Sequence, residues 1–348
     1  MKPLTAIAIS GGVDSLTAAF LLKQEGQRII GIHFLTGYET SIPAGGTIDR
    51  QIQDISDQLA IPIEIVDCAA AFKTEVVDYF IKSYRAGLTP NPCLVCNPSI
   101  KFGAVLTWAR RLGATRLATG HYARVRKDSL DGFHLHKGID VEKDQSYFLA
   151  RLTRDQLAQA VFPLGQMTKT DTKNLARTNG LKPITHTESQ DVCFIHGHTY
   201  GEFLEQHGTA SRPGPIVNLQ GKVLGQHKGL HHFTIGQRRG INCPAAKPYY
   251  VLKIEPEQNR LTVGNHDDLG TDRCRVEAIN WIQAPPTESL HIHTRVRYRH
   301  RAASSKLVPL GPHAADIFFD VPQKALTPGQ GAVFYDEDEV LGGGWIVR

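Results

Sequence analysis

Cysteines at a short spacing are the first residues in this chain whose types could carry out chemistry. Cys93 and Cys96 stand two residues apart in AGLTPNPCLVCNPSIKFG (86–103), a spacing typical of redox pairs and of soft-metal ligands. A zinc site would normally need a second such pair, which the chain lacks. Cys193 lies far along the chain in THTESQDVCFI (185–195), and taken alone it would be interpreted as a core cysteine.

A glycine turn near the amino terminus is the second chemical feature. The stretch AIAISGGVDSLTAAFLL (6–22) predicts a strand, a turn and a helix. Gly11 and Gly12 allow several amide N–H groups to point at one anion, and Ser10 and Ser15 add hydroxyl donors. The lysine of a Walker A loop is absent. The string resembles the PP-loop of ATP pyrophosphatases, which grips the pyrophosphate part of ATP while the bond between the α and β phosphates breaks.

Basic residues gather in HIHTRVRYRHRAASSK (291–306), within a chain of net charge +5. On a strand, alternate side chains share a face, so Arg295, Arg297, Arg299 and Arg301 are predicted to form one cationic row. A solvated strand face would be the plain explanation. Four like charges side by side repel each other, however, which favours a polyanionic partner such as an RNA or DNA backbone.

The elements that must position these residues follow an alternating pattern over the first half of the chain. Strands are predicted at 4–10, 28–35, 61–68 and 116–122, and helices at 14–25, 47–60, 70–86 and 99–112. This alternation predicts an α/β fold with a parallel sheet and right-handed crossovers. Ligands collect at the carboxyl ends of such strands, where the 10–15 turn, Phe34, Cys68 and Gly120 fall.

Helical patterns fade after about residue 205. The segment that follows is rich in glycine and short β-like runs, and from 270 onward short strands alternate with Pro/Gly turns, as in a small barrel. We therefore predict three domains at 1–204, 205–267 and 268–348.

Composition limits the class of protein. The 348 residues are 41% hydrophobic and 21% charged, typical of a globular protein rather than a disordered one. No apolar run approaches the roughly 20 residues of a membrane helix, and the amino terminus lacks the pattern of a signal peptide. We expect a cytoplasmic protein with reduced cysteines, of which Cys68, Cys243 and Cys274 are structural, and no membrane partner.

Histidine pairs occur at His196/His198, His231/His232 and His291/His293. No carboxylate or cysteine stands at ligand spacing to any of them, except Cys193 near His196, so we interpret them as polar loop histidines and predict no metal site there.

Seven motifs in order give the chain a family resemblance. They are SGGVDS, PNPCxxCNxxIKF, ATGHYAR, KDQSYFL, ESQDVCFI, FTIGQRRG and the closing PGQxAVFY…LGGGWI. This series resembles the bacterial tRNA-specific 2-thiouridylase (MnmA/TrmU) family over nearly the whole chain. The cysteine segments carry more of the resemblance than the glycine turn, which unrelated amide synthetases and sulfurtransferases share.

The resemblance implies a PP-loop, Rossmann-like catalytic domain, a small β-rich central tRNA-binding domain and a C-terminal β-barrel. The implied reaction is ATP-dependent 2-thiolation of the wobble uridine, position 34, of tRNAs for Lys, Glu and Gln. AMP is transferred to the 2-carbonyl oxygen, and sulfur then displaces AMP. Cys193 would carry the sulfur as a persulfide, and Cys96 would be a general acid/base or second nucleophile that takes up Cys193 as a disulfide. A cysteine desulfurase or sulfur-relay protein would donate the sulfur.

The resemblance also assigns binding residues. Those implied to contact ATP are Ala8, Ile9, Ser10, Gly11, Gly12, Val13, Asp14, Ser15, Phe34 and Gly120. Those implied to contact tRNA are Asn91, Pro92, Cys93, His121, Lys143, Asp144, Gln145, Tyr298, Arg299 and Gln330. Asp14 is a candidate magnesium or phosphate-network residue, with a helix-capping carboxylate as the alternative. Reactivity requires a thiolate, so we expect Cys193 to have solvent access and cationic neighbours.

Two departures from the family pattern stand out. Many relatives have an aspartate where this chain has Cys93, so Cys93, Cys96 and Cys193 could hold an iron–sulfur cluster with sulfide as the sulfur source. The loop 36–48 lacks the tryptophan, cysteine and acidic residues common in the family, which leaves its contacts open.

Three other functions compete. Another PP-loop ligase, such as an amide synthetase, would give Cys96 and Cys193 no use. A non-catalytic tRNA-binding protein would not need the intact Ser10–Ser15 string. A methyltransferase would need a methyl-donor glycine loop with an acidic partner, a pattern that we do not find in the sequence.

Overall fold

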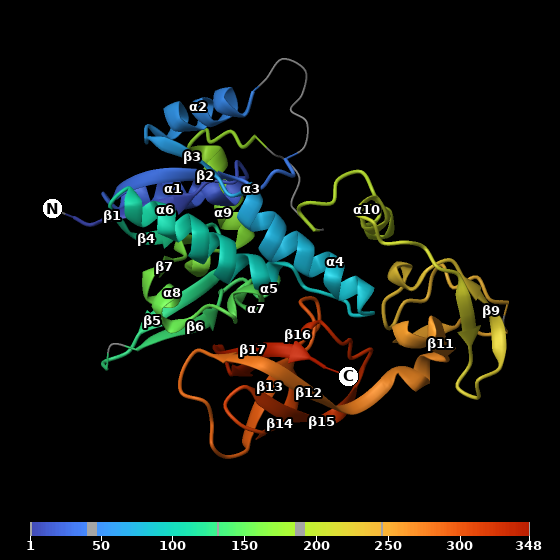
Figure 1. Cartoon of the computed structure of the whole chain (residues 1–348). Helices are drawn as coiled ribbons and strands as arrows, with labels where there is room; N and C mark the ends of the chain where they lie inside the picture. The colour runs from blue at the N-terminus through green and yellow to red at the C-terminus, as the bar shows by residue number, and fades with distance from the viewer. Residues whose placement is uncertain (1, 40–46, 131, 185–191, 245, 348) are drawn as a thin grey trace.

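Three bodies make up the molecule in the computed structural model: a parallel sheet with its helices, a barrel beneath it, and a four-stranded sheet to one side (Figure 1). The structure describes residues 2–39, 47–130, 132–184, 192–244 and 246–347. Most of the loop 36–48, and the residues from 185 to 191 before Cys193, therefore lie outside the described residues.

The first body is built on five parallel strands, so the predicted α/β fold is confirmed. In spatial order they are β3 (Ile63–Asp67), β2 (Arg28–Leu35), β1 (Leu4–Ala8), β4 (Ala114–Ala118) and β7 (Ala160–Val161). The strand order reverses direction between β1 and β4. Ligands of open parallel sheets bind at such a switch point, outside the carboxyl ends of the strands.

Both faces of this sheet are buried, as the continuous apolar strand β1 requires. Ala6 and Ala8 pack into one core, while the alternate residues Ile7 and Ile9 pack into the other. The helices that supply these two cores are α1 (Val13–Gln24), α2 (Ile48–Leu59), α3 (Ala69–Phe72), α4 (Asp78–Arg85), α5 (Cys93–Cys96), α6 (Leu106–Arg111), α7 (Ser146–Leu149), α8 (Arg154–Gln159) and α9 (Lys169–Thr178).

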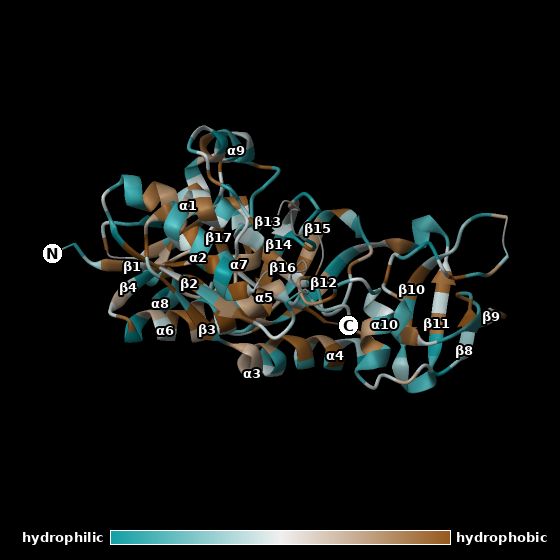
Figure 2. Ribbon diagram, turned by 90° about the horizontal axis from the view of Figure 1, so that it is seen from above, coloured by the Kyte–Doolittle hydropathy of each residue, from teal (hydrophilic) through white to brown (hydrophobic). Residues whose placement is uncertain are grey.

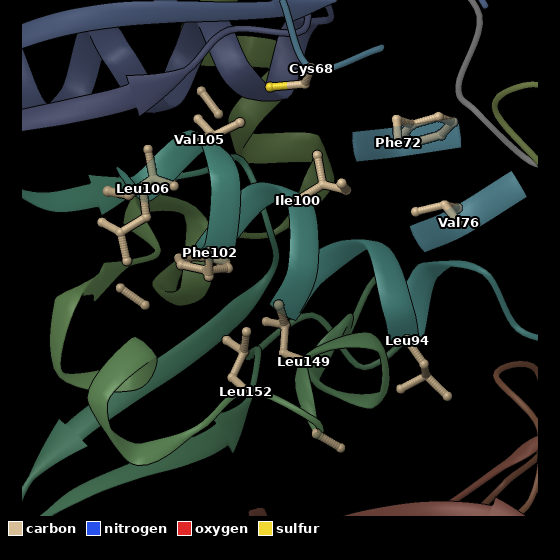
Figure 3. Close-up of a cluster of buried hydrophobic side chains, with 14 of the residues drawn as sticks. Cys68, Phe72, Val76, Leu94, Ile100, Phe102, Val105, Leu106, Leu149 and Leu152 are labelled. Atoms are coloured by element: carbon tan, nitrogen blue, oxygen red, sulfur yellow. The ribbon is translucent and has the colours of Figure 1, made fainter. Parts of the chain in front are cut away.

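Two of the predicted helices contain π-helical segments. The helix expected at 70–86 is α3, the π-helix η1 (Lys73–Val77) and α4, and the helix expected at 99–112 is α5, the π-helix η2 (Asn97–Val105) and α6. Figure 3 shows the apolar side chains that fix the second of these, with Leu94, Ile100, Phe102 and Val105 turned into the core. A 3₁₀ turn, η3 (Pro163–Gln166), leads into α9.

The second body follows α10 (Tyr200–Gln206) and lies at the far end of the molecule in both views (Figures 1 and 2). Its strands are β8 (Gly214–Val217), β9 (Val223–His227), β10 (Tyr250–Glu255) and β11 (Arg260–Gly264), in the order β10-β11-β8-β9. Three 3₁₀ turns accompany them: η4 (Leu230–His232), η5 (Pro256–Gln258) and η6 (His266–Leu269).

The third body is a closed barrel of six strands, because β12 pairs with β17 as well as with β15. The strands are β12 (Gly270–Trp281), β13 (Leu290–Arg295), β14 (Ala303–Pro309), β15 (Ala314–Lys324), β16 (Gly331–Asp336) and β17 (Glu339–Ile346). A hairpin that we did not predict, β5 (Ala123–Lys127) and β6 (Phe133–Lys137), adds to this sheet through β17. The first body and the barrel therefore share a sheet.

The predicted cationic row is wrong. Strand β13 ends at Arg295, so the four arginines do not alternate along one strand. Arg295 is mostly buried and pairs with Asp144, and Arg297 donates to Ala325 O and Thr327 Oγ1. Arg299 and Arg301 are exposed, which leaves two of the four facing solvent.

Among the described residues, no helix combines the length and apolar character needed to cross a bilayer. The cytoplasmic location, like the domain limits at 205 and 268, stays a prediction.

Candidate nucleotide and thiol site

The glycine turn after β1 is shaped by its own serines. Ser15 Oγ donates to Gly12 O at 2.9 Å and accepts from Ser10 N at 3.2 Å, which draws the turn around the first residues of α1. Gly11 has φ +80°, a backbone conformation that favours glycine. Gly12 caps α1 without a side-chain bond, so the first N–H groups of α1 stay available to an anion. The turn therefore fits a phosphate chain.

Gly120, just past β4, lies against this turn. A Cβ at position 120 would stand 2.9 Å from the carbonyl carbon of Asp14 and 3.0 Å from Ser15 N. Any larger residue would push the first turn of α1 away, so the close approach of α1 to the end of β4 requires glycine at position 120. Phe34 is half-buried at the end of β2.

Asp14 takes part in a network inside the protein. Lys169 Nζ on α9 lies 2.7 Å from both of its carboxylate oxygens, and Tyr122 OH donates to one of them at 2.9 Å. The contacts connect α1 to α9 and to the residue that follows His121. They favour a role for Asp14 in holding the loop, rather than the simple helix cap that was the alternative.

Cys93 and Cys96 open the long helix that continues through η2. Pro92 precedes α5, and Pro98 lies inside the continuous helix, at the point where α5 passes into η2, and has no N–H to donate there. Asn97, which follows Cys96, is buried and donates to Phe148 O at 2.9 Å. Inserted π-helical turns occur frequently at functional sites, and this one carries Lys101.

Cys193 is positioned by the buried ring beside it. Phe194 packs edge-on against Phe72 of α3 and Phe80 of α4, at centroid distances of 5.8 and 5.2 Å, and contacts Phe203 of α10 at 5.4 Å. Cys193 is an exposed residue, as is Cys93. The reactivity of the Cys193 thiol stays a prediction.

The three thiols and Lys101 act on one another electrostatically. Desolvation by the surrounding protein raises the pKa of Cys93 to about 11 and that of Cys96 to about 12, and it raises the pKa of Cys193 as well. The Lys101 ammonium opposes this, since it lowers the pKa of all three thiols, while the charge of Cys193 raises the pKa of both other cysteines. Cys96 and Cys193 therefore lie close enough for the charge of one thiol to act on the other.

His121 connects the thiol group to the nucleotide turn. Its Nε2 lies 3.4 Å from Lys101 Nζ, its Nδ1 lies 2.7 Å from Thr119 Oγ1, and it follows Gly120 directly in the chain. Burial and the nearby Lys101 charge hold the pKa of His121 well below its usual value, so the ring is neutral at pH 7. Glycine turn, His121, Lys101 and thiols form a continuous site.

The other residues expected to contact tRNA divide into buried and accessible groups. Asn91, Asp144 and Gln330 are buried, and Asp144 and Gln330 bond within the protein. Gln145 exchanges bonds with the backbone of Tyr122, and Tyr298 stacks on Phe148 at 4.3 Å. Arg299 is exposed and Lys143 is half-buried. Their roles toward tRNA stay predictions.

Sequence reasoning missed Lys101, Lys169 and Tyr122. Lys101 stands inside the quoted IKF string and Tyr122 inside ATGHYAR, so their positions were noted without a role. Lys169 had no motif, and only the packing of α9 against α1 reveals it as the partner of Asp14.

Family models cover most of the chain. The model described as "tRNA methyl transferase HUP domain" matches residues 4–197, the "tRNA methyl transferase PRC-barrel domain" matches 201–265, and the "Aminomethyltransferase beta-barrel domain" matches 271–346.

Curated relatives are similar over nearly their full lengths. A protein of Desulfosudis oleivorans named tRNA-specific 2-thiouridylase MnmA is 50% identical over 99% of this chain and 95% of its own length. Proteins with the same name from Gloeothece citriformis and Geotalea uraniireducens are 44% and 43% identical, over 98% of this chain and 99% and 94% of theirs.

Proposed function

This chain belongs to the tRNA-specific 2-thiouridylase family, and we propose that its own glycine turn and thiols carry out the family's ATP-dependent sulfur transfer to a tRNA uridine. One observation carries the proposal. Lys101 acts on Cys93, Cys96 and Cys193 and also contacts His121, beside the Gly120 that packs on the nucleotide turn. The turn that would bind ATP and the thiols that would carry sulfur therefore lie next to each other. The methyl transfer in the family models' descriptions is not favoured, because we find no methyl-donor glycine loop in the sequence.

ATP would be held by the turn from Ser10 to Ser15, whose open N–H groups and positive φ at Gly11 fit a phosphate chain. When bound, ATP supplies the AMP that makes the uridine 2-oxygen a good leaving group. Asp14 stands at the same turn, where magnesium would sit beside the phosphates, and Lys169 fixes its carboxylate.

Cys193 would bring the sulfur. Its persulfide attacks carbon 2 of the activated uridine, and the 2-oxygen leaves with AMP. Cys96 then attacks the Cys193 sulfur, the bond to the transferred sulfur breaks, and a Cys96–Cys193 disulfide remains for a thiol reductant to reduce. The Lys101 charge favours the anionic form of Cys193 and of Cys96, the form in which each thiol reacts.

The substrate must reach the thiols from an anticodon loop, so the uridine would be turned out of its stack. Cys93 is exposed beside Cys96 and follows Asn91 and Pro92, the segment that we assign to the base. Wobble uridines of tRNAs for Lys, Glu and Gln are the proposed substrates, and a cysteine desulfurase or sulfur-relay protein is the proposed donor.

An iron–sulfur variant of the same reaction uses the same thiols. Cys93 adds a third thiol to the pair, and three cysteines can ligate a cluster in which sulfide is the sulfur source. Anaerobic purification followed by an absorption spectrum and an iron count separates the two chemistries, since a persulfide enzyme carries no stoichiometric iron.

The test is a thiolation assay with ATP, a sulfur donor and unmodified tRNA, followed by measurement of 2-thiouridine in nuclease digests. We expect Cys193→Ser to abolish the product while tRNA binding is retained. Cys274→Ser, in the barrel strand β12, is the matched control and should leave the yield unchanged. Full activity in Cys193→Ser would refute the persulfide role.

A further inference from the structure

Three side chains of ligand type meet outside the thiol site, where α10 reaches the second body. Glu205 stands near the end of α10, and His231 and His232 lie on the 3₁₀ turn η4. Glu205 Oε1 is 3.5 Å from His231 Nε2 and 3.2 Å from His232 Nε2. Within the described ranges, this is the one group of three or more His, Cys, Asp or Glu whose ligand atoms all lie within 4.8 Å of one another.

The spacing of these atoms matches a tetrahedral ion. Zinc holds nitrogen and oxygen ligands at about 2.0–2.1 Å, so two ligands of a tetrahedral ion stand about 3.3–3.4 Å apart. The two measured separations from Glu205, 3.5 and 3.2 Å, bracket that value. Ser211 Oγ lies 3.5 Å from each histidine Nε2 and donates to Glu205 Oε1 at 2.6 Å, a separation too short for two ligands of one tetrahedral ion, so Ser211 supports the carboxylate as a hydrogen-bond donor.

Gly201 and Gly229 leave the space that the two imidazole rings occupy. A Cβ at Gly201 would stand 2.3 Å from His232 Nδ1, and a Cβ at Gly229 would stand 2.7 Å from His231 Cε1. His231 is only 5% exposed, so its ring is fixed by packing.

We propose that Glu205, His231 and His232 bind a zinc ion, with a water as the fourth ligand. Two imidazoles and one carboxylate suit zinc better than the all-oxygen preference of magnesium or calcium. The sequence analysis predicted no metal at this histidine pair because no carboxylate stands near it in the chain; the fold supplies Glu205 from α10. The ion would tie α10 to the second body.

The test is calorimetric titration of the full-length protein with Zn²⁺ after chelation and dialysis, in the wild type and in Glu205→Gln. Glu202→Gln is the matched control: it lies on the same helix, and a glutamine can keep the capping box that Glu202 makes with Thr199. Zinc bound by the cysteines is common to all three proteins and cancels in the comparison. We expect one equivalent of zinc to be lost, or weakened by at least about tenfold, in Glu205→Gln alone, since even loss of a supporting hydrogen bond around zinc weakens binding by that amount.

Added zinc should also raise the midpoint of thermal unfolding of the wild type and of Glu202→Gln, because a ligand that binds only the folded state stabilises it. A second variant, His232→Ala, should behave as Glu205→Gln does. The proposal is wrong if Glu205→Gln and His232→Ala bind as many equivalents of zinc as the wild type does, with the same affinity.

Discussion

Lys101 is a residue whose single charge acts on all three thiols. It lowers the pKa of Cys93, Cys96 and Cys193 against the desolvation that raises them. Replacing Lys101 by Gln should therefore raise these pKa values further, reduce the thiolate fraction at any pH below them, and slow alkylation several-fold, since one pKa unit is a tenfold change in thiolate.

Site-resolved iodoacetamide labelling by mass spectrometry, between pH 7 and 9.5, measures that effect. Lys101→Arg keeps the charge and should restore most of the rate. Lys73→Gln removes an exposed lysine that pairs with Asp78, and should change nothing. Equal labelling of Cys193 in wild type and Lys101→Gln would show that the charge does not control the thiols.

The chemical residues that could be predicted from sequence were those of unusual type or spacing. The cysteine pair and the glycine turn were identified from residue type and spacing, whereas Cys193 was identified only through the family resemblance; in the structure, Cys193 lies close enough to Cys96 to raise its pKa. Lys101 could not be singled out, because lysines are common and its importance depends on the fold, which brings Cys193 and His121 to the helix that carries Cys93, Cys96 and Lys101. The arginine row failed because β13 ends at Arg295, a boundary that residue alternation does not reveal.

At the scale of elements, the turn between β1 and α1 requires glycine at position 11, because the backbone there has a positive φ. Gly11→Ala would place a Cβ at φ +80°, which costs about 1–2 kcal/mol, and 3.2 Å from Ile184 Cδ1. We expect this variant to lose stability and, because the N–H groups must turn, to lose ATP binding as well.

Gly113→Ala is the matched control for that prediction. Gly113 has φ +85° and open space around it, so the same backbone strain arises away from the site. Denaturant unfolding should show a similar loss of about 1–2 kcal/mol in both variants, while nucleotide titration should separate them. If Gly11→Ala bound ATP as Gly113→Ala does, the turn would not be the phosphate site.

Helices and strands with a regular spacing of apolar residues were predicted well, whereas local departures from regular backbone geometry were not predicted. The strand at 28–35 matches β2, and the helix at 47–60 matches α2 to within a residue or two. The π-helical turns of η1 and η2 depend on a shift of backbone hydrogen bonds that leaves the apolar pattern nearly unchanged. The β5–β6 hairpin was missed because its sheet partner, β17, lies at the other end of the chain.

That hairpin gives the molecule a pH-dependent contact. His134 on β6 lies 2.6 Å from Glu339 on β17 and 3.0 Å from Asp128, and the bond to Glu339 is the largest cause that raises the His134 pKa above 6.5. The stabilisation is therefore complete below pH 6.5 and is lost as pH rises through the folded value. His134→Gln should flatten the fall in free energy of unfolding between pH 6 and 8, by less than about 1 kcal/mol because the pair is near the surface.

Denaturant melts at several pH values measure this slope. His291→Gln, an exposed histidine on β13, serves as control and should keep the wild-type slope. A slope in His134→Gln equal to that of the wild type would mean that the hairpin contact does not titrate in this range.

At the scale of the whole molecule, the barrel is fastened to the cysteine segment by close packing. Gln330 Nε2 donates to Thr89 O and Pro90 O, just before Asn91, and Tyr147 OH donates to Gly331 O. A Cβ at Gly331 would stand 2.3 Å from Leu94 Cδ1. Leu94 lies between Cys93 and Cys96 in the sequence. The barrel thus helps to hold α5 in place, so the closing PGQ motif serves the thiol site from the far end of the chain.

A second fastening joins the residues that we assign to tRNA. Asp144, 3% exposed, accepts from Arg295 Nη1 at 3.1 Å, and Arg295 also donates to Tyr298 O, so the 143–145 and 298–299 segments adjoin. Removing one partner of a buried ion pair typically costs about 3–5 kcal/mol, because the other charge is left uncompensated. Asp144→Asn should therefore destabilise the protein by about that amount and weaken tRNA binding, although its own carboxylate is sealed from solvent.

The barrel offers a matched pair for comparison. Asp316 binds Arg275 at 2.9 Å on the barrel surface, so Asp316→Asn should cost no more than about 1 kcal/mol and leave tRNA affinity unchanged. A double-mutant cycle of Asp144→Asn with Arg295→Met, followed by denaturant unfolding and by tRNA titration at one fixed salt concentration, isolates the pair's coupling. A coupling near zero, or Asp144→Asn as mild as Asp316→Asn, would mean that packing alone holds the barrel against the catalytic body. A large coupling with reduced tRNA affinity would mean that this buried pair sets the distance between the two segments that we assign to tRNA.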